Sequence, residues 1–203
     1  MIDLYYAPTP NGYKIKIFLE ESGLEYKTIN VNLRNGEQFK PEFLAISPNN
    51  KIPAIVDHNP ADKKEPLSVF ESGAILLYLA DKAGKFMPKE FRAREEATQW
   101  LFWQAANLTP MASQATYFNN YATEKVPYAI ERYEKELTRL YGILDKQLKE
   151  KEFIAGEYSI VDMICYPWIV LSESHHQNLD DFPNLKRWFE NMAKRPAVKR
   201  AYG

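Results

Sequence analysis

The chain has 203 residues, enough for one large domain or two small ones, and it should bury about 70% of the surface that its unfolded state exposes. Its 26 basic and 27 acidic residues give a formal charge of −1. This balance excludes electrostatic attraction as the basis for binding nucleic acid or an anionic membrane, so we expect neither as a partner.

The single cysteine, Cys165, excludes a disulfide within the chain, as is usual for proteins of reducing compartments. The first residues lack the basic and apolar segments of a signal peptide, so the sequence predicts a cytoplasmic protein. His175 and His176 are adjacent and would diverge on a helix, and no acidic or cysteine partner has ligand spacing. We therefore expect no metal site. Cysteines outside disulfides often fill the core, and we expect this of Cys165.

The first part of the chain alternates short apolar strands with helical patterns, which is typical of an α/β layer fold. The expected strands cover residues 2–6, 28–31, 54–56 and 67–70, and the expected helices cover 11–22, 41–45 and 72–83. Gly23 and Gly84 follow two of these helices directly, where glycine commonly ends a helix.

Helical spacing dominates the second part of the chain. A segment rich in Lys, Pro and Glu, residues 84–91, separates it from the first part and is read as a linker. From residue 92 to 203 apolar residues recur at intervals of three and four, which predicts a bundle of helices. Ser159 and Asp162 form a capping box, so a helix should begin directly after Ser159.

A candidate peptide-binding turn occupies residues 47–55, with the sequence SPNNKIPAI. Pro53 stands before a short apolar strand and is a candidate for a cis peptide bond. Such a turn would leave the amide and carbonyl of Ile52 without strand partners, free to pair with an extended ligand.

Glu71 and Ser72 immediately precede a helical pattern and supply a second element of recognition. The hydroxyl of Ser72 and the first amides of the helix can bind an anion, while Glu71 can accept a hydrogen bond from an ammonium. An ammonium beside a carboxylate is an α-amino-acid group, so these residues are expected to bind the α-amino-acid end of a ligand.

At these residues the chain resembles the glutathione transferase superfamily. The run from Tyr6 to Lys14 (YAPTPNGYK), together with Gln38 and residues 128–133, is similar to the bacterial nu-class branch, and the resemblance extends almost end to end. It implies an α/β N-terminal thioredoxin-like domain that binds glutathione, residues 1–83, a linker at 84–91, and an all-α C-terminal helical bundle domain, residues 92–203.

The resemblance also assigns roles to individual residues. The turn with Ile52 and Pro53 pairs with the cysteinyl backbone of glutathione, the Glu71–Ser72 pair holds its γ-glutamyl group, and Gln38 reaches its glycyl end. Arg132 binds a ligand carboxylate, from the same or a partner subunit. The implied glutathione-binding residues are Gln38, Lys51, Ile52, Pro53, Glu71, Ser72 and Arg132. By composition alone, Gln38 would be a loop residue and Arg132 part of a solvated helix face.

The glutathione thiol reacts as a thiolate, so the protein must stabilise a sulfur anion. Asn11 is the first candidate and Thr9 the second, because both are hydrogen-bond donors beside a helix N-terminus. Thr9 before Pro10 is also a good N-cap, which is the structural alternative. Tyr5 or Tyr6 could act instead, as tyrosines do in other transferase classes, but the nu-like Thr-Pro-Asn run ranks both lower.

The function implied is a homodimeric, glutathione-dependent disulfide-bond oxidoreductase that acts on a small disulfide without a catalytic protein cysteine. Glutathione, reduced or as its disulfide, is the co-substrate. Two alternatives remain. One is a transferase that conjugates electrophiles or acts as a weak peroxidase, and the other is a non-catalytic glutathione-binding regulatory module.

Overall fold

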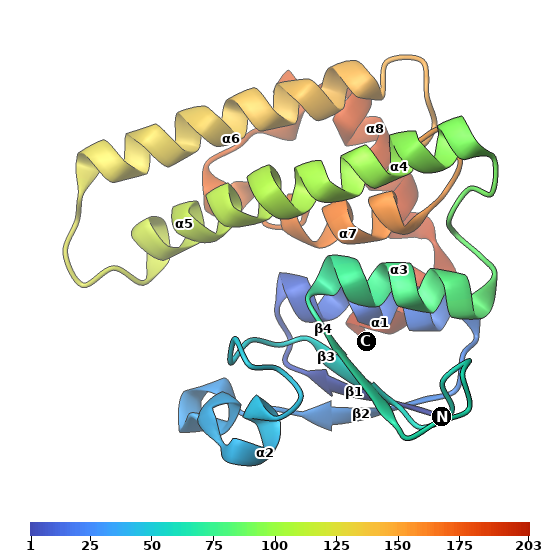
Figure 1. The fold of residues 1–203 in the computed structure, drawn as a ribbon. Coiled ribbons are helices and arrows are strands. Elements are labelled where there is room, and N and C mark those ends of the chain that lie inside the picture. The colour runs from blue at the N-terminus through green and yellow to red at the C-terminus, as the bar shows by residue number, and fades with distance from the viewer. The chain divides into compact units, whose positions relative to one another are not determined.

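The computed structural model describes all 203 residues (Figure 1). The chain divides into two compact units, one of residues 1–87 with 196–203 and one of residues 88–195. The last eight residues, which the sequence assigned to the helical domain, join the N-terminal unit because the helix α9 (Pro196–Tyr202) packs on α1 (Pro10–Ser22). The rings of Tyr13 and Tyr202 stack with their centroids 4.0 Å apart, and Arg200 forms an ion pair with Glu20 at 2.8 Å.

The N-terminal unit is built on a four-stranded mixed sheet. Its strands are β1 (Ile2–Tyr6), β2 (Tyr26–Asn30), β3 (Ala54–Asp57) and β4 (Leu67–Phe70), in the order β2-β1-β3-β4. The strands β1 and β2 are parallel, whereas β3 is antiparallel to both β1 and β4. All four expected strands are present, although β2 begins two residues before its predicted start and ends one residue before its predicted end.

Helices cover both faces of this sheet, as the alternating pattern predicted. The helices α1 and α3 (Ser72–Ala83) pack together, and α3 contacts β3 and β4 (Figure 1). The short α2 (Pro41–Leu44) packs on the opposite face through Phe43, whose ring meets that of Tyr5 at 6.1 Å. Alternation along β1 explains this division, because Ile2, Leu4 and Tyr6 are buried and Tyr5 points the other way.

The predicted helix ends are confirmed at two glycines. Gly23 and Gly84 follow α1 and α3 with φ angles of 74° and 65°, in the left-handed region that glycine adopts without a Cβ penalty. Between β2 and α2 the chain forms two short 3₁₀ turns, η1 (Leu33–Asn35) and η2 (Glu37–Phe39).

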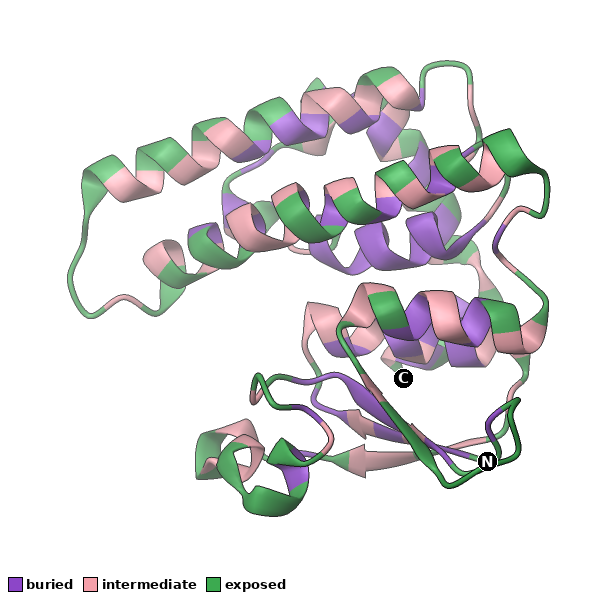
Figure 2. Ribbon diagram, viewed as in Figure 1, coloured by how far each residue is buried: buried purple, intermediate pink, exposed green.

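The second unit is all helical, as predicted. It contains α4 (Phe91–Trp103), a π-helical turn η3 (Gln104–Leu108), α5 (Thr109–Asn120), α6 (Pro127–Gln147), α7 (Ile160–Ile169) and α8 (Pro183–Lys194). Short 3₁₀ turns η4 (Glu173–His175) and η5 (Leu179–Asp181) connect α7 to α8. Every residue of α7 is buried, and Figure 2 shows this helix purple along its length. The helix α7 is therefore the core of its unit.

The capping box at the start of α7 is confirmed. The amide of Val161 donates to the Ser159 hydroxyl at 3.2 Å, and the amide of Ser159 donates to the Asp162 carboxylate at 3.0 Å. Burial raises the pKa of the Asp162 carboxyl to about 6, while hydrogen bonds from Ile154, Trp188 and Ser159 act in the opposite direction. This cap supplies hydrogen bonds to the first turn of a helix whose residues are all buried.

Candidate functional site

The register of the sheet brings distant segments of the N-terminal unit to one edge. Ala54, at the start of β3, pairs with Tyr5 near the end of β1 and with Phe70 at the end of β4. The segments that adjoin these three strand ends therefore leave the sheet on the same side. They are the β1–α1 connection with Thr9 and the first turn of α1 with Asn11, the turn with Lys51, Ile52 and Pro53, and the start of α3 with Glu71 and Ser72.

The turn before β3 has the geometry that the sequence predicted. The Ile52–Pro53 peptide bond is cis. Neither the amide nor the carbonyl of Ile52 makes a hydrogen bond within the chain. The Ile52 side chain is 8% exposed and belongs to an apolar cluster with Ala7, Val31 and Phe43. The side chain thus fixes the residue, while its backbone donor and acceptor remain open to a ligand.

The N-terminus of α3 carries no side-chain cap. Glu71 occupies the N-cap position without a capping hydrogen bond, and its φ of 71° lies in the left-handed region, which is unusual for a residue other than glycine. The first amide of the helix that pairs within the chain is that of Ile75, which donates to Glu71. The amides of the first turn are therefore available to an anion, and an observed outlier of this kind is often associated with a functional site.

Lys14 is a residue of this region whose role the sequence analysis did not assign. It lies on α1, is only 1% exposed, and places its Nζ 3.4 Å from the Ser72 Oγ. Lysine is almost never fully buried without a partner. A signal existed in the sequence, because Lys14 lies three and four residues before the buried Ile17 and Phe18, on the inward face of an otherwise apolar helix.

Thr9 is an N-cap in the structure, which is the structural alternative considered above. Its hydroxyl oxygen accepts a hydrogen bond from the amide of Gly12 at 3.3 Å. A threonine hydroxyl that accepts one bond keeps its proton for donation, so this cap is compatible with a bond to a ligand sulfur. Asn11 lies one residue inside the helix, at the positive end of its dipole.

The two tyrosines of β1 pack against other aromatic rings. Tyr6 is buried against Tyr13, and burial is the main cause that raises the pKa of the Tyr6 hydroxyl. Burial also raises the pKa of Tyr5, which packs against Phe43. A raised pKa keeps a phenol protonated and disfavours its use as a base. The ranking of both tyrosines below Asn11 and Thr9 stays a prediction.

Gln38 lies in the turn η2 and is engaged within its own loop. Its side-chain amide donates to the carbonyl of Leu33 at 3.3 Å, while its Oε1 is buried without a partner. Glu37 closes the same loop by accepting from the amide of Asn32 at 2.8 Å. A contact between Gln38 and the glycyl end of glutathione stays a prediction.

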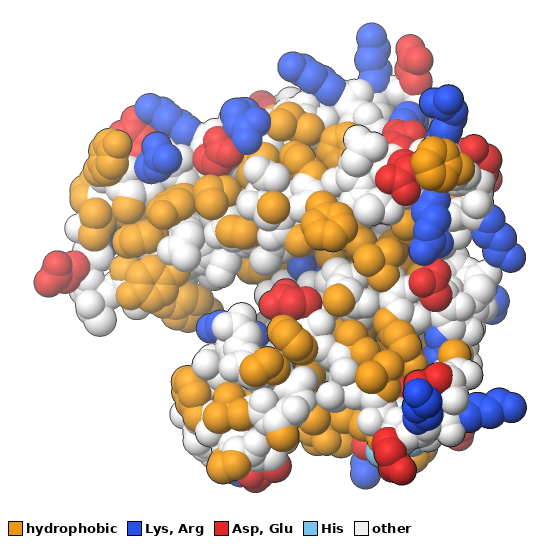
Figure 3. All heavy atoms as spheres, in the orientation of Figure 1, with side chains coloured by type: hydrophobic (Ala, Val, Ile, Leu, Met, Phe, Trp, Pro, Cys, Tyr) orange, Lys and Arg blue, Asp and Glu red, His pale blue; other side chains and the backbone are white.

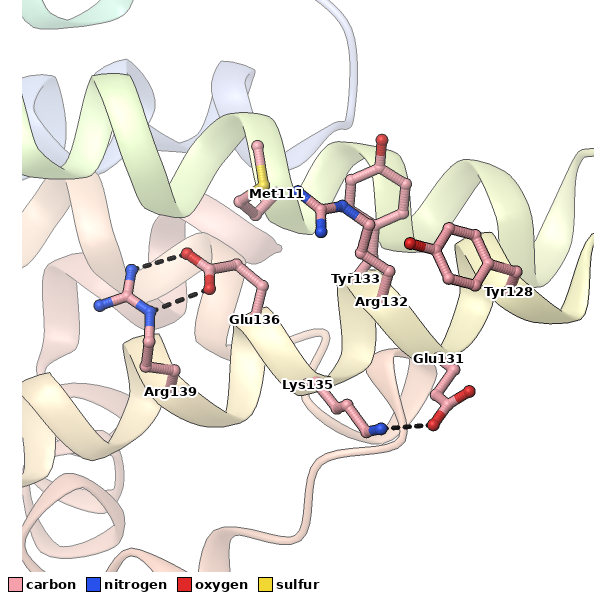
Figure 4. Close-up of a pocket in the computed structure, with 8 residues that line it drawn as sticks. All are labelled: Met111, Tyr128, Glu131, Arg132, Tyr133, Lys135, Glu136 and Arg139. Carbon is pink, nitrogen blue, oxygen red and sulfur yellow. Dashed lines mark hydrogen bonds and ion pairs between the residues drawn. The ribbon is translucent and has the colours of Figure 1, made fainter.

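Arg132 lies in the helical unit, where it lines a groove of about 790 Å³ between α5 and α6 (Figure 4). The groove holds three cations. Lys135 pairs with Glu131, and Arg139 binds Glu136 through hydrogen bonds of 2.9 and 2.6 Å. Arg132 makes neither a hydrogen bond nor an ion pair, and Figure 4 shows its side chain pointing toward Met111 of α5. It is therefore the one cation of the groove without a hydrogen bond or ion pair, and its charge acts on Glu136 only through space.

Three further features concern metal-ligating side chains, the cysteine and the helices. No group of three or more His, Cys, Asp or Glu side chains could hold a metal ion. Cys165 is not part of a disulfide, and it has no exposed surface. No helix has the length and apolar character needed to cross a membrane.

Comparisons with known proteins identify the family of the chain. The family models for the "Glutathione S-transferase, N-terminal domain" and "C-terminal domain" match residues 2–81 and 107–196. The chain is 55% identical over 202 residues to the disulfide-bond oxidoreductase YfcG of Escherichia coli (strain K12), covering 99% of this chain and 94% of that one.

Solved structures of similar proteins contain glutathione. A glutathione transferase family member from Pseudomonas fluorescens pf-5, with two glutathione bound, superposes with a TM-score of 0.93 at 44% identity, over 99% of this chain and 92% of that one. A glutathione transferase from Pseudomonas putida, with one glutathione disulfide bound per subunit, gives 0.95 at 39% identity, over 99% and 90%. The two-domain fold, the matched family models and these relatives together show that the chain belongs to the glutathione S-transferase family.

Proposed function

We propose that this protein is an enzyme that binds glutathione and uses its thiol to reduce disulfide bonds. The observation that carries the proposal is the convergence of three recognition elements at one edge of the sheet. They are the backbone of Ile52, the uncapped start of α3 after Glu71, and the N-terminus of α1 at Thr9 and Asn11. Lys51 belongs to the same turn.

Each element matches one part of glutathione. The amide and carbonyl of Ile52 pair with the cysteinyl carbonyl and amide, as one β-strand pairs with another. The first amides of α3, with Ser72, bind the α-carboxylate of the γ-glutamyl group, and Glu71 accepts from its ammonium. The thiol then lies toward the N-terminus of α1. There the helix dipole and the donors of Asn11 and Thr9 lower its pKa.

The reaction is a pair of thiol–disulfide exchanges. The thiolate of one glutathione attacks a sulfur of the substrate disulfide, forming a mixed disulfide and releasing one substrate thiolate, which takes up a proton. The thiolate of a second glutathione attacks the glutathione sulfur of the mixed disulfide. This step releases the second substrate thiol and forms glutathione disulfide. Two glutathione molecules are oxidised for each disulfide reduced.

The exchanging sulfurs belong to glutathione in this proposal, not to the protein. Cys165 is the only cysteine of the chain and has no exposed surface, so a substrate disulfide could not reach it without local unfolding. The name of the E. coli relative and the glutathione and glutathione disulfide bound to the Pseudomonas proteins support this choice of reaction and co-substrate.

The assembly and compartment are part of the proposal. Figure 3 shows hydrophobic side chains gathered over the ends of α5 and α6, where Tyr121 and Tyr128 are 71% and 76% exposed. A second copy of the chain would cover such a surface, so we expect a homodimer. Arg132 would bind a ligand carboxylate in its own subunit or in the partner. A lone, buried cysteine agrees with the reducing cytoplasm.

The test is steady-state reduction of a small disulfide, hydroxyethyl disulfide, by glutathione in a coupled assay with glutathione reductase. Wild type and Cys165→Ala should turn over at similar rates. Loss of turnover in a folded Cys165→Ala variant would make the protein thiol the reacting sulfur. If neither protein reduces the disulfide while a chlorinated aromatic electrophile is conjugated, the protein is a transferase. If glutathione binds without any turnover, it is a binding module.

A further inference from the structure

We propose that Ser47 is a positioning residue that aims the backbone amide of Ile52 at the ligand. The inference rests on the proposed binding of glutathione at the Ile52 turn. Ser47 is only 1% exposed, and its hydroxyl donates a hydrogen bond of 2.8 Å to the carbonyl oxygen of Lys51. This bond is made inside the turn, on the residue immediately before Ile52.

Ser47 is itself held in place by its backbone. Its amide donates to the carbonyl of Phe43 at 2.9 Å, which ties it to the end of α2, and its carbonyl accepts from the amide of Asn50 at 2.9 Å. Asn50 adopts a φ of 50°, so the chain reverses direction between Ser47 and Lys51. The backbone of Ser47 is thus held in place, and the hydrogen bond from its hydroxyl holds the carbonyl of Lys51 in place as well.

The carbonyl of Lys51 and the amide of Ile52 belong to the same peptide group. The only cis bond of the chain is Ile52–Pro53, so the Lys51–Ile52 peptide is trans. In a trans peptide the C=O and N–H bonds lie in one plane and point in opposite directions. A hydrogen bond that holds the Lys51 carbonyl inward therefore holds the Ile52 amide outward.

Two consequences for ligand binding follow from this coupling. Without the Ser47 hydroxyl the peptide plane could rotate, and binding would have to restrict that rotation, which lowers affinity. A hydrogen bond to the carbonyl also polarises the peptide group and makes its N–H a stronger donor. Both effects act only on ligands that accept a bond from the Ile52 amide. The specific acceptor is the cysteinyl carbonyl of glutathione.

The test compares two ligands by calorimetry. Glutathione has the cysteinyl carbonyl, whereas γ-glutamylcysteamine keeps the γ-glutamyl group and the thiol but lacks that carbonyl. Ser47→Ala should weaken glutathione binding about tenfold and leave the affinity for γ-glutamylcysteamine within about twofold of wild type. Ser47→Thr, which keeps the hydroxyl, should bind glutathione as wild type does.

The matched control is Ser22→Ala. Ser22 lies in the same unit at the far end of α1, and its hydroxyl also donates to a local carbonyl, that of Leu19 at 3.3 Å. Its loss should leave both affinities unchanged. Should Ser47→Ala not fold, Ser47→Cys repeats the comparison, because a thiol of similar size is a weak donor.

Two results would overturn the assignment. One is a folded Ser47→Ala protein that binds glutathione as tightly as wild type. The other is an equal loss of affinity for the two ligands, which would give Ser47 a general structural role. Failure of the proposed function is distinguishable from both, because the wild-type protein itself would then not bind glutathione.

Discussion

The ammonium nitrogen of Lys14 lies 3.4 Å from the hydroxyl oxygen of Ser72, so a buried cation of α1 meets the first turn of α3. Ser72 and the free amides that follow it form the proposed anion site for the γ-glutamyl carboxylate. A positive charge behind this site adds to the partial charge of the helix N-terminus, and it does so where little water screens it.

Lys14→Met should therefore weaken glutathione binding by about tenfold or more, measured by calorimetry. The control is Lys16→Met, the same change on the same helix. The Lys16 ammonium lies over the Tyr6 ring, 5.5 Å from its centroid, and not beside Ser72. Equal affinities for the two variants would show that the Lys14 charge does not act on the ligand.

Asn11→Ala should raise the pKa of the bound glutathione thiol by about one to two units, because a hydrogen bond to a charged sulfur contributes about 1.5–3 kcal/mol. The thiolate absorbs in the ultraviolet, so titration of that absorbance measures the change. Asn11→Ser, which keeps a donor, should give a smaller shift. An unaltered titration in Asn11→Ala would remove this residue from thiol activation.

Arg132→Ala should weaken glutathione binding by about 1–3 kcal/mol, because this guanidinium lines the groove and can form a charge-assisted hydrogen bond with a ligand carboxylate. Lys146→Ala is the matched control, since it removes one exposed cation from the same helix outside the groove. Calorimetry measures the affinity of both variants for glutathione. If Arg132→Ala binds as Lys146→Ala does, Arg132 belongs to a solvated helix face.

Gly12→Ala should destabilise the fold by about 1–3 kcal/mol, because a Cβ at this position would lie 2.3 Å from the backbone oxygen of Ala7. The helical Gly142 is the opposite case, since the nearest atom to an added Cβ is a ring carbon of Phe182 at 4.0 Å. Gly142→Ala should stabilise by about 0.5–1 kcal/mol. Urea unfolding of both variants tests the pair, and equal shifts would contradict the close approach at Gly12.

His175 should make the stability of the protein depend on pH. Its side chain is fully buried, with its Nε2 2.9 Å from the Oγ1 of Thr116, and its Nδ1 has no partner. Burial, with a smaller contribution from the charge of His176, lowers the pKa of His175 to about 4. The folded state therefore holds His175 neutral, whereas the unfolded chain protonates it below about pH 6.5.

Above about pH 6.5 both states hold His175 neutral, so this residue does not lower the stability of the fold. As the pH falls from 6.5 toward 4, the unfolded chain takes up the proton first, and the stability of the folded state decreases. At pH 5.0 this residue should cost about 2 kcal/mol relative to pH 7.5. His175→Gln keeps a donor near Thr116 but does not titrate. Its unfolding free energy, measured in urea, should fall less between these two pH values than that of wild type. Identical pH dependence in the two proteins would refute the assignment.

Local features of this protein were predictable from sequence because they depend on neighbouring residues. The cap at Ser159 and the helix ends at Gly23 and Gly84 each follow from a few adjacent side chains and their backbone preferences. The alternating and helical periodicities predicted the class of each unit for the same reason.

Contacts between segments far apart in the chain depended on the tertiary structure. Ala54 meets Tyr5 and Phe70 only because of the sheet register, and this register brings the candidate binding segments to one edge. The approach of Lys14 to Ser72 requires α1 and α3 to pack side by side. The sequence by itself thus determined the strands and helices of the first unit to within a few residues, the helical class of the second unit, and the family, because these are set by local preference and motif. The fold decided which backbone donors stay unpaired and which candidate binding segments lie together, because that depends on which distant groups satisfy one another.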